Sequence, residues 1–305
     1  MSDSKKLLIQ AAIQIGAGGT AGFTEICIMF PLDLVKTRLQ LQTTATSAIK
    51  SSDPHYYNGV FDCITKMYRY EGLRSFWKGI LPPILVETPN RAVKFVTFEQ
   101  TKRFFMFGSS TPTPLTFTLA GLAAGTVEGI IVNPFEVVKV TLQSNKALAS
   151  QAPSTWSVTR QIVRENGLGL QGINKGLTAT IMRHGVANMV AFGFYFSVQG
   201  YTREYEDPLR QFGQKVAIAF TSGVLCSCVN IPFDVAKSRI QGPQPVAGVV
   251  KYRTTTGAIL TVYREEGFRA LYKGLTPKVM RIGPGAAITL VVYDYITLFL
   301  KSKLN

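Results

Sequence analysis

The stretch PLDLVKTRLQ at residues 31–40 returns twice along the chain, as PFEVVKVTLQ at residues 134–143 and as PFDVAKSRIQ at residues 232–241. Each copy has a proline, an acid two residues later and a lysine three residues after the acid. The copies lie about 100 residues apart, and self-similarity at a fixed spacing is the mark of internal repeats. The spacing therefore predicts three structural units of similar length.

A second signature follows each copy and fixes the register of the repeats. It reads EGLRSFWKG ending at Gly79, NGLGLQGINKG ending at Gly176 and EGFRALYKG ending at Gly274. With both signatures aligned, the repeats cover residues 8–107, 111–206 and 210–302. We expect one domain over residues 1–305, because a unit of two helices cannot bury a core of its own.

The composition indicates a membrane protein. Charged residues make up 17% of the chain and hydrophobic residues 46%, whereas soluble domains carry about 25% charged residues. Apolar segments of about 20 residues are long enough to span a bilayer. Six are predicted, at roughly 11–30, 80–105, 115–133, 180–200, 214–232 and 280–300. The predicted fold is an all-α membrane protein, with six transmembrane helices from three pseudo-symmetric repeats closed into one ring.

Loop charge and small residues support this ring. The long loops at 41–79, 144–176 and 242–274 hold fourteen Lys and Arg against six acids, so positive charge collects on one side of the membrane, as orientation bias requires. Small residues four positions apart allow close helix contacts in a membrane. Such pairs occur at equivalent positions of the three repeats, at Gly18 and Gly22, Gly121 and Gly125, and Ala219 and Gly223.

Several other classes of protein fit the sequence poorly. The net charge of +15 would suit a nucleic-acid-binding protein, but the basic residues are scattered along the chain rather than gathered with aromatic residues on one face. An enzyme is disfavoured because no nucleophile–base–acid set and no metal-ligand spacing appears, and His55 and His184 are the two histidines. We predict no catalytic residue and no metal ligand. The four cysteines, Cys27, Cys63, Cys226 and Cys228, are expected to be reduced thiols, and MSDSKKLLIQ carries no evident removable targeting peptide.

The tripled Pro-x-acid-x-x-Lys and Lys-Gly signatures resemble the mitochondrial carrier family over nearly the whole chain. The resemblance implies six tilted transmembrane helices around a central cavity and three short helices on the matrix side. It also implies a monomer in the mitochondrial inner membrane, with both termini facing the intermembrane space. A carrier of this family would bind small substrates and membrane lipids, with no nucleic-acid partner.

The resemblance assigns the acids and lysines of the repeated motif to a gate at the matrix side. The pairs would join neighbouring helices: Asp33 with Lys139, Glu136 with Lys237, and Asp234 with Lys36. Proline removes a backbone hydrogen bond and clashes one turn back, so Pro31, Pro134 and Pro232 would bend their helices inward. Side-chain amides one turn further along, at Gln40, Gln143 and Gln241, would brace the pairs. An ordinary surface pair of Asp33 and Lys36 would not explain three copies.

The substrate lacks threefold symmetry, so positions that differ between the repeats should contact it. Seven residues past the Lys-Gly glycines lie Val86, Arg183 and Arg281. Two arginines at one depth of a membrane are costly unless they face a functional cavity, and each can hold a carboxylate bidentately. This predicts a small dicarboxylate. Nearby residues complete the candidate site: His184 and Asn188 as hydrogen-bond donors to a group between the carboxylates, Arg91 and Lys94 as added positive charge, and Glu87 as a partner for Arg91.

Structural explanations for the same residues remain open. Arg183 and Arg281 could instead pair with acids inside the membrane, such as Glu25 or Glu128, and His184 could make a structural hydrogen bond. The Arg-His pair at 183–184 resembles that of the keto-acid carriers in the family. The runs GILPPILVETPNRAVKFVTFEQ, NKGLTATIMRHG, VNPFEVVKV and NIPFDVAKSRIQGPQPV resemble the same group.

This resemblance implies counter-exchange of 2-oxoadipate for 2-oxoglutarate. A citrate carrier, or a carrier of other di- or tricarboxylates, is the closest competing function, and it would favour a third cation where this chain has Val86. A proton-leak protein or a channel is a further possibility that strict exchange would rule out. No cofactor is expected. Cardiolipin is the expected lipid, at the helix N-termini after YNG (57–59) and the Lys-Gly motifs, whereas PSTW (153–156) leaves the second-repeat site in doubt.

A second ring of the family lies at the other end of the cavity and is incomplete here. The first repeat has the whole motif in Phe98, Glu99 and Lys102, but the corresponding positions lack complementary charges. They read Tyr195, Phe196 and Gln199 in the second repeat, and Tyr293, Asp294 and Thr297 in the third. We therefore expect no complete ion pair in this cytoplasmic gate and a resting state with the matrix gate shut. Apolar contact among the aromatic side chains would hold the cytoplasmic gate.

Overall fold

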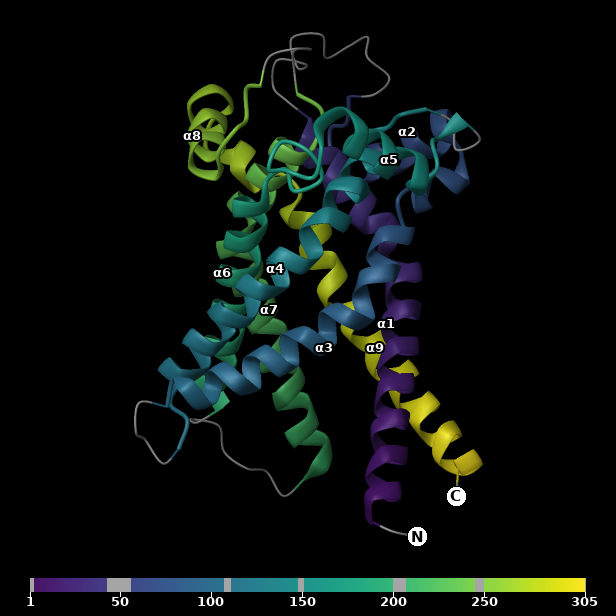
Figure 1. Cartoon of the computed structure of the whole chain (residues 1–305), viewed down its shortest axis with the longest axis vertical. Helices are drawn as coiled ribbons and strands as arrows, with labels where there is room; N and C mark the ends of the chain where they lie inside the picture. The colour runs from purple at the N-terminus through teal and green to yellow at the C-terminus, as the bar shows by residue number, and fades with distance from the viewer. Residues whose placement is uncertain are drawn as a thin grey trace.

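In the computed structural model, the described residues are 3–42, 56–106, 111–147, 151–199, 207–244 and 250–304. Within them the chain is helical (Figure 1). The long helices are α1 (Asp3–Leu41), α3 (Leu81–Phe104), α4 (Pro114–Ser144), α6 (Leu177–Gln199), α7 (Pro208–Gln241) and α9 (Leu275–Leu304). The short helices are α2 (Val60–Glu71), α5 (Thr155–Asn166) and α8 (Thr255–Glu266), and the 3₁₀ turns are η2 (Leu73–Trp77) and η4 (Phe268–Tyr272).

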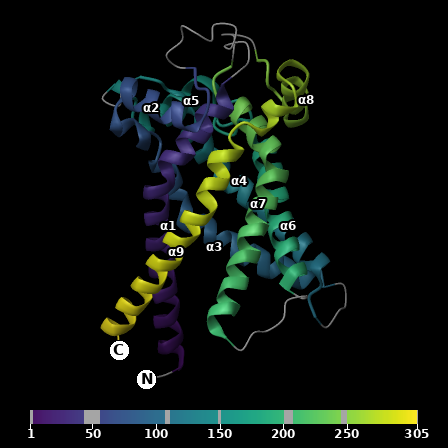
Figure 2. The ribbon, with the colours of Figure 1, turned by 180° about the vertical axis from the view of Figure 1, so that it is seen from behind.

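The six long helices form a closed ring. Each packs against the next along the chain, and α9 returns to pack against α1, which confirms the predicted closure. The short helices α2, α5 and α8 lie together at one end, and both termini lie at the other (Figures 1 and 2). We call these the short-helix end and the terminal end. The helices α1, α4 and α7 also contact one another, and the long helices spread apart toward the terminal end (Figures 1 and 2).

The first helix of each repeat continues beyond its proline. The apolar segments suggested spans that stop near Pro31, Pro134 and Pro232, but α1, α4 and α7 run on to Leu41, Ser144 and Gln241. The motif that opens at each proline therefore forms the last turns of a helix. These turns carry the charged residues that the apolar spans exclude, and they place those residues where α1, α4 and α7 meet.

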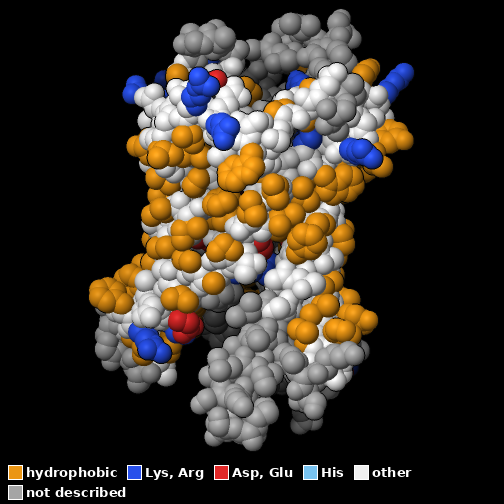
Figure 3. All heavy atoms as spheres, turned by 45° about the vertical axis from the view of Figure 1, so that its right-hand side comes forward, with side chains coloured by type: hydrophobic (Ala, Val, Ile, Leu, Met, Phe, Trp, Pro, Cys, Tyr) orange, Lys and Arg blue, Asp and Glu red, His pale blue; other side chains and the backbone are white. Residues whose placement is uncertain are grey.

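Hydropathy alone detects three spans among the residues that the structure describes. By length and composition, three segments of the described chain qualify as spans: Pro114–Ser144, Val216–Gln241 and Phe268–Leu300. On the face shown in Figure 3, hydrophobic side chains cover the middle of the molecule, and Lys and Arg side chains appear at the short-helix end. Exposed apolar residues on the long helices include Ile28, Ile130 and Val229. An apolar belt with a basic end is the surface expected of a helix ring in a bilayer.

The glycines of the Lys-Gly signature are required by backbone conformation. Gly79, Gly176 and Gly274 have φ values of +76°, +71° and +86°, in the left-handed region that residues with a Cβ atom rarely adopt. A Cβ atom would also crowd the first helix of the next repeat around the ring; at Gly79 it would lie 3.2 Å from the Lys139 carbonyl oxygen. The signature therefore marks the turn that leads into α3, α6 and α9 close beside a neighbouring helix.

The small-residue pairs do not all serve as contacts between backbones. At Gly121 a Cβ atom would lie 2.9 Å from the Asn188 carbonyl oxygen, and at Gly125 it would lie closer still to that of His184. These glycines let α4 and α6 touch through their backbones. In the first repeat the prediction is wrong for Gly18, because no atom lies within 4 Å of its added Cβ. Its partner Gly22 faces the flexible end of Arg91 instead.

The four cysteines are free thiols, as expected. Cys63 is buried in α2 beside Met67, and burial raises the pKa of its thiol to about 12. Since the thiolate is the reactive form, Cys63 is inert in the folded protein.

We expect Gly125→Ala to lower the stability of the protein in detergent by about 1–3 kcal/mol, because the new methyl group must displace the backbone of α6. The matched control is Gly18→Ala, whose methyl group meets no atom within 4 Å. Alanine is the better helix former, so the control should leave the thermal midpoint unchanged or slightly raised. Equal midpoints for the two variants, measured by thermal unfolding, would contradict the close α4–α6 contact.

Candidate functional site

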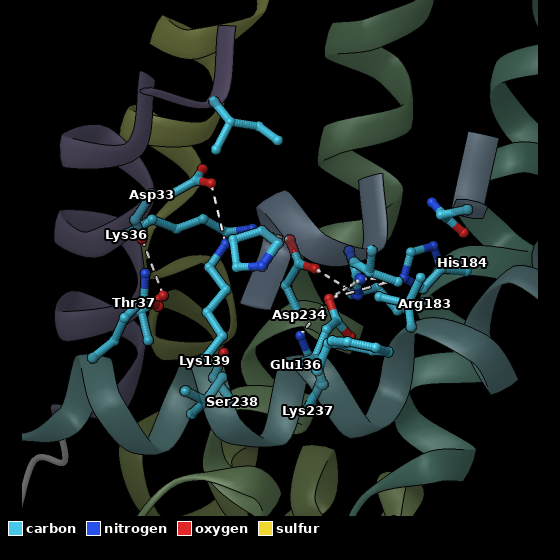
Figure 4. A pocket seen from close by; sticks show the side chains of 18 of the residues that line it. Asp33, Lys36, Thr37, Glu136, Lys139, Arg183, His184, Asp234, Lys237 and Ser238 are labelled. Atoms are coloured by element: carbon cyan, nitrogen blue, oxygen red, sulfur yellow. Dashed lines mark hydrogen bonds and ion pairs between the residues drawn. The ribbon is translucent and has the colours of Figure 1, made fainter. Parts of the chain in front are cut away.

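Three ion pairs join α1, α4 and α7 where these helices meet (Figure 4). Nitrogen–oxygen distances are 3.2 Å for Lys139 and Asp33, 2.8 Å for Lys237 and Glu136, and 2.7 Å for Lys36 and Asp234. This is the pairing between neighbouring helices that the sequence predicts. The Asp234 side chain is only 3% exposed, so the pairs close the ring well inside the protein.

The three glutamines near these pairs make other contacts than expected. Gln40 accepts a hydrogen bond from the Ser238 hydroxyl at 2.8 Å. Gln241 donates to Asn133 and Thr180, at 3.0 and 3.1 Å. The amide of buried Gln143 has no hydrogen-bond partner among the described residues. The hydrogen bonds of Gln40 and Gln241 link helices beside the ion pairs and do not reach the charged groups.

A cavity of about 270 Å³ lies against the ion pairs, close to the lower limit of about 300 Å³ for small-molecule pockets. All six residues of the pairs line it, together with Glu87, Arg183, His184 and Arg281. A wider cavity of about 720 Å³ adjoins it, and Arg281 and Arg91 line that space. The two arginines predicted to bind substrate therefore line a polar cavity, and Arg281 also lines the wider one.

Both arginines already hold carboxylates. Arg281 is 2.7 Å from Glu25 and 2.7 Å from Asp33. Arg183 is 2.5 Å from Glu136 and 3.7 Å from Asp234. Pairing with Glu25 was the structural explanation left open by the sequence, and Arg281 adopts it in part. Since Asp33, Glu136 and Asp234 also form the three ion pairs, each arginine is linked to the closure of the ring.

Lys278 is a further cation at these acids that the sequence analysis did not identify. Its ammonium group lies 2.8 Å from Asp234. The aligned positions in the other repeats, four residues past the Lys-Gly glycine, are Pro83 and Thr180. A lysine opposite a proline and a threonine is a break in symmetry, so the same comparison that found the arginines could have found it.

Glu128 collects the polar side chains that were expected to face the substrate. This buried acid on α4 lies 2.7 Å from the Asn188 amide nitrogen and 3.2 Å from His184 Nδ1, both on α6. From α3 it receives the Asn90 amide at 3.1 Å and Lys94 at 3.5 Å. Asn188 and Lys94 are thus turned toward Glu128 in this structure. The aligned residues in the first and third repeats are Glu25 and Cys226. The three repeats differ at this position, so comparison of their sequences could have identified it.

The remaining expected residues are found as follows. Arg91 donates to Glu87 at 2.5 Å, in the predicted pair four residues apart. Near the terminal end, Lys102 pairs with Glu99 on its own helix at 2.7 Å, and Asp294 is exposed. Phe98 is buried against Phe117 and Phe192. Tyr195 and Tyr293 are partly buried on α6 and α9, while the side chains of Phe196 and Gln199 lie outside the described part of the structure.

Two buried ion triads at the short-helix end were missed by the sequence analysis. Arg38 and Lys78 both contact Glu71, at 2.9 and 2.7 Å. In the third repeat, Arg239 and Lys273 both contact Glu266 at 2.9 Å. Burial alone would raise the pKa of Glu266, but the charges of Arg239 and Lys273 hold it below its usual value. Each triad fastens a short helix to the last turns of α1 or α7.

The second repeat has lost this triad. Thr141 takes the place of the arginine and Asn166 the place of the acid, which leaves Lys175 with a 3.3 Å hydrogen bond to the Gly242 carbonyl. Apolar packing of Val138, Leu142 and Val158 holds α5 to α4 instead. The loss could have been predicted from the sequence, because NGLGLQGINKG begins with Asn166 where EGLRSFWKG begins with the acid of the triad, Glu71.

Removing the acid of a buried triad should destabilise the protein more than removing an acid of a surface pair on the same helix. We expect Glu71→Gln to cost about 3–5 kcal/mol, because it leaves two buried cations without their partner. The control is Asp62→Asn, which breaks a half-exposed pair with Lys66 worth under about 1 kcal/mol. Thermal unfolding in detergent measures both changes, and a smaller loss for Glu71→Gln than for Asp62→Asn would contradict the role given to the triad.

No group of three or more His, Cys, Asp and Glu side chains suited to a metal ion occurs in the described part of the chain. The side chains that line the cavity offer charge and hydrogen bonds. Two guanidinium groups, an imidazole and three ammonium groups line the cavity together with five carboxylates. At these cations the carboxylates of a small anion can take the place of the protein's own carboxylates.

Comparison with known proteins agrees with the geometry. A family model described as "Mitochondrial carrier protein" matches residues 9–109, 110–206 and 209–304. The human mitochondrial 2-oxodicarboxylate carrier is 55% identical over 289 residues, covering 95% of this chain and 94% of that protein. The mouse protein of the same name is 53% identical over 297 residues, covering 97% of each chain. Mitochondrial citrate transporter D of Aspergillus niger is 39% identical over 294 residues, covering 95% and 94%.

Proposed function

The chain belongs to the mitochondrial carrier family, and from this premise we propose that it exchanges 2-oxodicarboxylates such as 2-oxoadipate and 2-oxoglutarate across the mitochondrial inner membrane. The observation that carries the proposal is the pair Arg183 and Arg281, on different helices beside one cavity. Two guanidinium forks suit a molecule with a carboxylate at each end. The human 2-oxodicarboxylate carrier is 55% identical to this chain and citrate transporter D is 39% identical, which supports this choice over a tricarboxylate.

In the proposed mechanism the carboxylates of the substrate replace those of the protein. The short-helix end would be the matrix side, and the three ion pairs there would be the gate. A substrate carboxylate that takes Arg281 leaves Asp33 with one cation fewer, and the same holds for Arg183 and Glu136. A ligand shifts an equilibrium only through its differential affinity for two states. Competition for shared arginines would supply that difference and weaken the gate only when the substrate is present.

The proposed resting state has the matrix gate shut and the other end open. Three interhelical ion pairs hold the short-helix end, whereas the described Glu99 and Lys102 pair within α3. We infer that the cytoplasmic gate is held by aromatic contacts, including Tyr195 and Tyr293. The carrier would act as a monomer, with both termini in the intermembrane space.

Cardiolipin is the proposed lipid, bound at the short-helix end. The chain enters α2 after Gly59, α6 after Gly176 and α9 after Gly274, and free backbone N–H groups at helix N-termini attract phosphate. At α5 the Ser154 hydroxyl accepts from the Ser157 N–H at 3.2 Å. One of these donors is thus already engaged, in keeping with a weaker site in the second repeat.

Uptake of labelled 2-oxoglutarate into liposomes that contain the purified protein tests the function. We expect uptake when the liposomes hold 2-oxoadipate or 2-oxoglutarate and none when they hold no counter-substrate. Faster uptake against internal citrate than against 2-oxoadipate would favour the tricarboxylate function. Uptake into empty liposomes would indicate a channel or a uniporter.

The arginines are tested in the same assay. Arg183→Ala and Arg281→Ala should each lower exchange by at least about tenfold, since each removes a charge-assisted contact to a carboxylate. Lysine at either position should rescue only part of the activity, because an ammonium group cannot form the fork. The control is Arg264→Ala, an exposed arginine on α8, which should exchange like the wild type. Wild-type exchange by Arg183→Ala or Arg281→Ala would remove that residue from the site.

The imidazole of His184 is tested through the choice of substrate. If it contacts the oxo group, His184→Leu should slow exchange of 2-oxoadipate more than exchange of adipate, which has no oxo group to lose a hydrogen bond. Initial rates for the two labelled substrates measure the ratio. Equal losses would mean that His184 acts only through Glu128 and the general charge of the cavity.

A further inference from the structure

The contacts of His184 indicate which of its two ring nitrogens carries hydrogen. Glu128 receives the amide N–H groups of Asn90 and Asn188, so it acts as an acceptor, and the nearby Nδ1 must carry hydrogen. On the other side, Nε2 faces the guanidinium of Arg183, which has only N–H groups to offer. Nε2 therefore presents its lone pair, and the imidazole is neutral with its hydrogen on Nδ1.

The charges around His184 come from four helices and are finely balanced. In direct reach are Arg183 on α6 and the two acids of α4, with Glu136 Oε1 3.9 Å from Nε2. Lys94 of α3 acts through Glu128, while Asp234 and Lys237 of α7 act through Arg183 and Glu136. Two carboxylates thus favour a charged imidazole, and the guanidinium in contact with Nε2 is the group that opposes it.

A bound dicarboxylate would weaken the effect of Arg183, the group that opposes protonation of His184. In the proposed binding mode one carboxylate takes Arg183, which neutralises the guanidinium and draws it away from Nε2. The freed lone pair then faces a carboxylate of the substrate, while Glu128 still holds Nδ1. Imidazole is the side chain that changes charge near neutral pH. Neutralising the guanidinium beside Nε2 therefore favours the charged form of the His184 imidazole.

We propose that His184 binds a proton from water each time a dicarboxylate binds, so that the site holds a proton as well as two carboxylates. The new N–H bond is on Nε2, and the resulting imidazolium lies between Glu128 and the substrate. Both of its nitrogens then donate, one to Glu128 and the other to the substrate's carboxylate or oxo oxygen. This inference rests on the proposed function, because it requires a dicarboxylate on Arg183.

Proton binding and substrate binding then favour one another. If a bound dicarboxylate increases the affinity of His184 for a proton, linkage requires that the dicarboxylate binds more tightly at lower pH. Exchange of one dicarboxylate for another would carry a proton in each direction, so the two proton movements cancel. Substrate affinity would nevertheless depend on the pH of each compartment.

The direct test is proton uptake by the purified carrier in detergent, in weakly buffered solution with a pH-indicator dye. Addition of 2-oxoglutarate, whose carboxyls are ionised above about pH 6, should remove up to about one proton from solution per bound molecule near pH 7. In reconstituted liposomes the apparent KM should rise by up to about tenfold per pH unit on the alkaline side. No proton uptake between pH 6 and 8 by a protein that exchanges 2-oxoglutarate would overturn the inference and leave the function standing.

Two variants assign the proton to this pair. His184→Asn removes the titrating group, and Glu128→Gln removes the charge at Nδ1 while keeping an acceptor oxygen; both should abolish or strongly reduce proton uptake. The matched control is Glu165→Gln, at an exposed acid on α5, which should take up protons like the wild type. Full uptake by His184→Asn would overturn the assignment. Should the wild-type protein fail to exchange any dicarboxylate, the proposed function itself would fall.

Discussion

Burying negative charge inside a ring of apolar helices is the constraint on which the structure depends. A buried carboxylate is tolerated only when cations meet it closely, and Asp33, Glu136 and Asp234 each contact at least two. Lys36, Lys139 and Lys237 come from the repeated motif and join the helices, whereas Lys278 does not. The arginines come from positions that the repeats do not share. One set of acids therefore connects the symmetric closure of the ring to the asymmetric site that would hold a ligand.

Much of this arrangement could be predicted because the sequence states it three times. Equal residues in equal repeats must occupy equivalent places in a ring, so Asp33, Glu136 and Asp234 must have equivalent partners. Which neighbouring helix supplies each partner was implied by the resemblance to the mitochondrial carrier family. The extent of the helices was harder to predict. Charges that face an internal cavity look the same in a hydropathy profile as charges that face water, and among the described residues hydropathy recognises spans in α4, α7 and α9.

Side-chain partners in the cavity were predicted less well. Spacing gives the depth of a residue in the membrane, but not which neighbour it meets, so the hydrogen bonds of Asn188 and Gln241 depend on Glu128 and Asn133 across a helix interface. Other omissions came from incomplete comparison of the repeats. The break in symmetry at Glu25, Glu128 and Cys226 is as clear as the one that revealed Arg183, but it lies on the first helix of each repeat.

The glycine contacts between α4 and α6 limit how the ring can change shape. Where Gly121, Gly125 and Gly129 face α6, carbonyl groups and Cα atoms occupy the space that side chains would fill. Sliding one helix along the other would drive those groups into residues that carry a Cβ atom. The helices α4 and α6 can tilt together but cannot slide along one another, so the second repeat moves as one rigid unit. Movement between inward- and outward-facing forms must then be taken up at the looser seams, where α7 meets α9 and α1 meets α3.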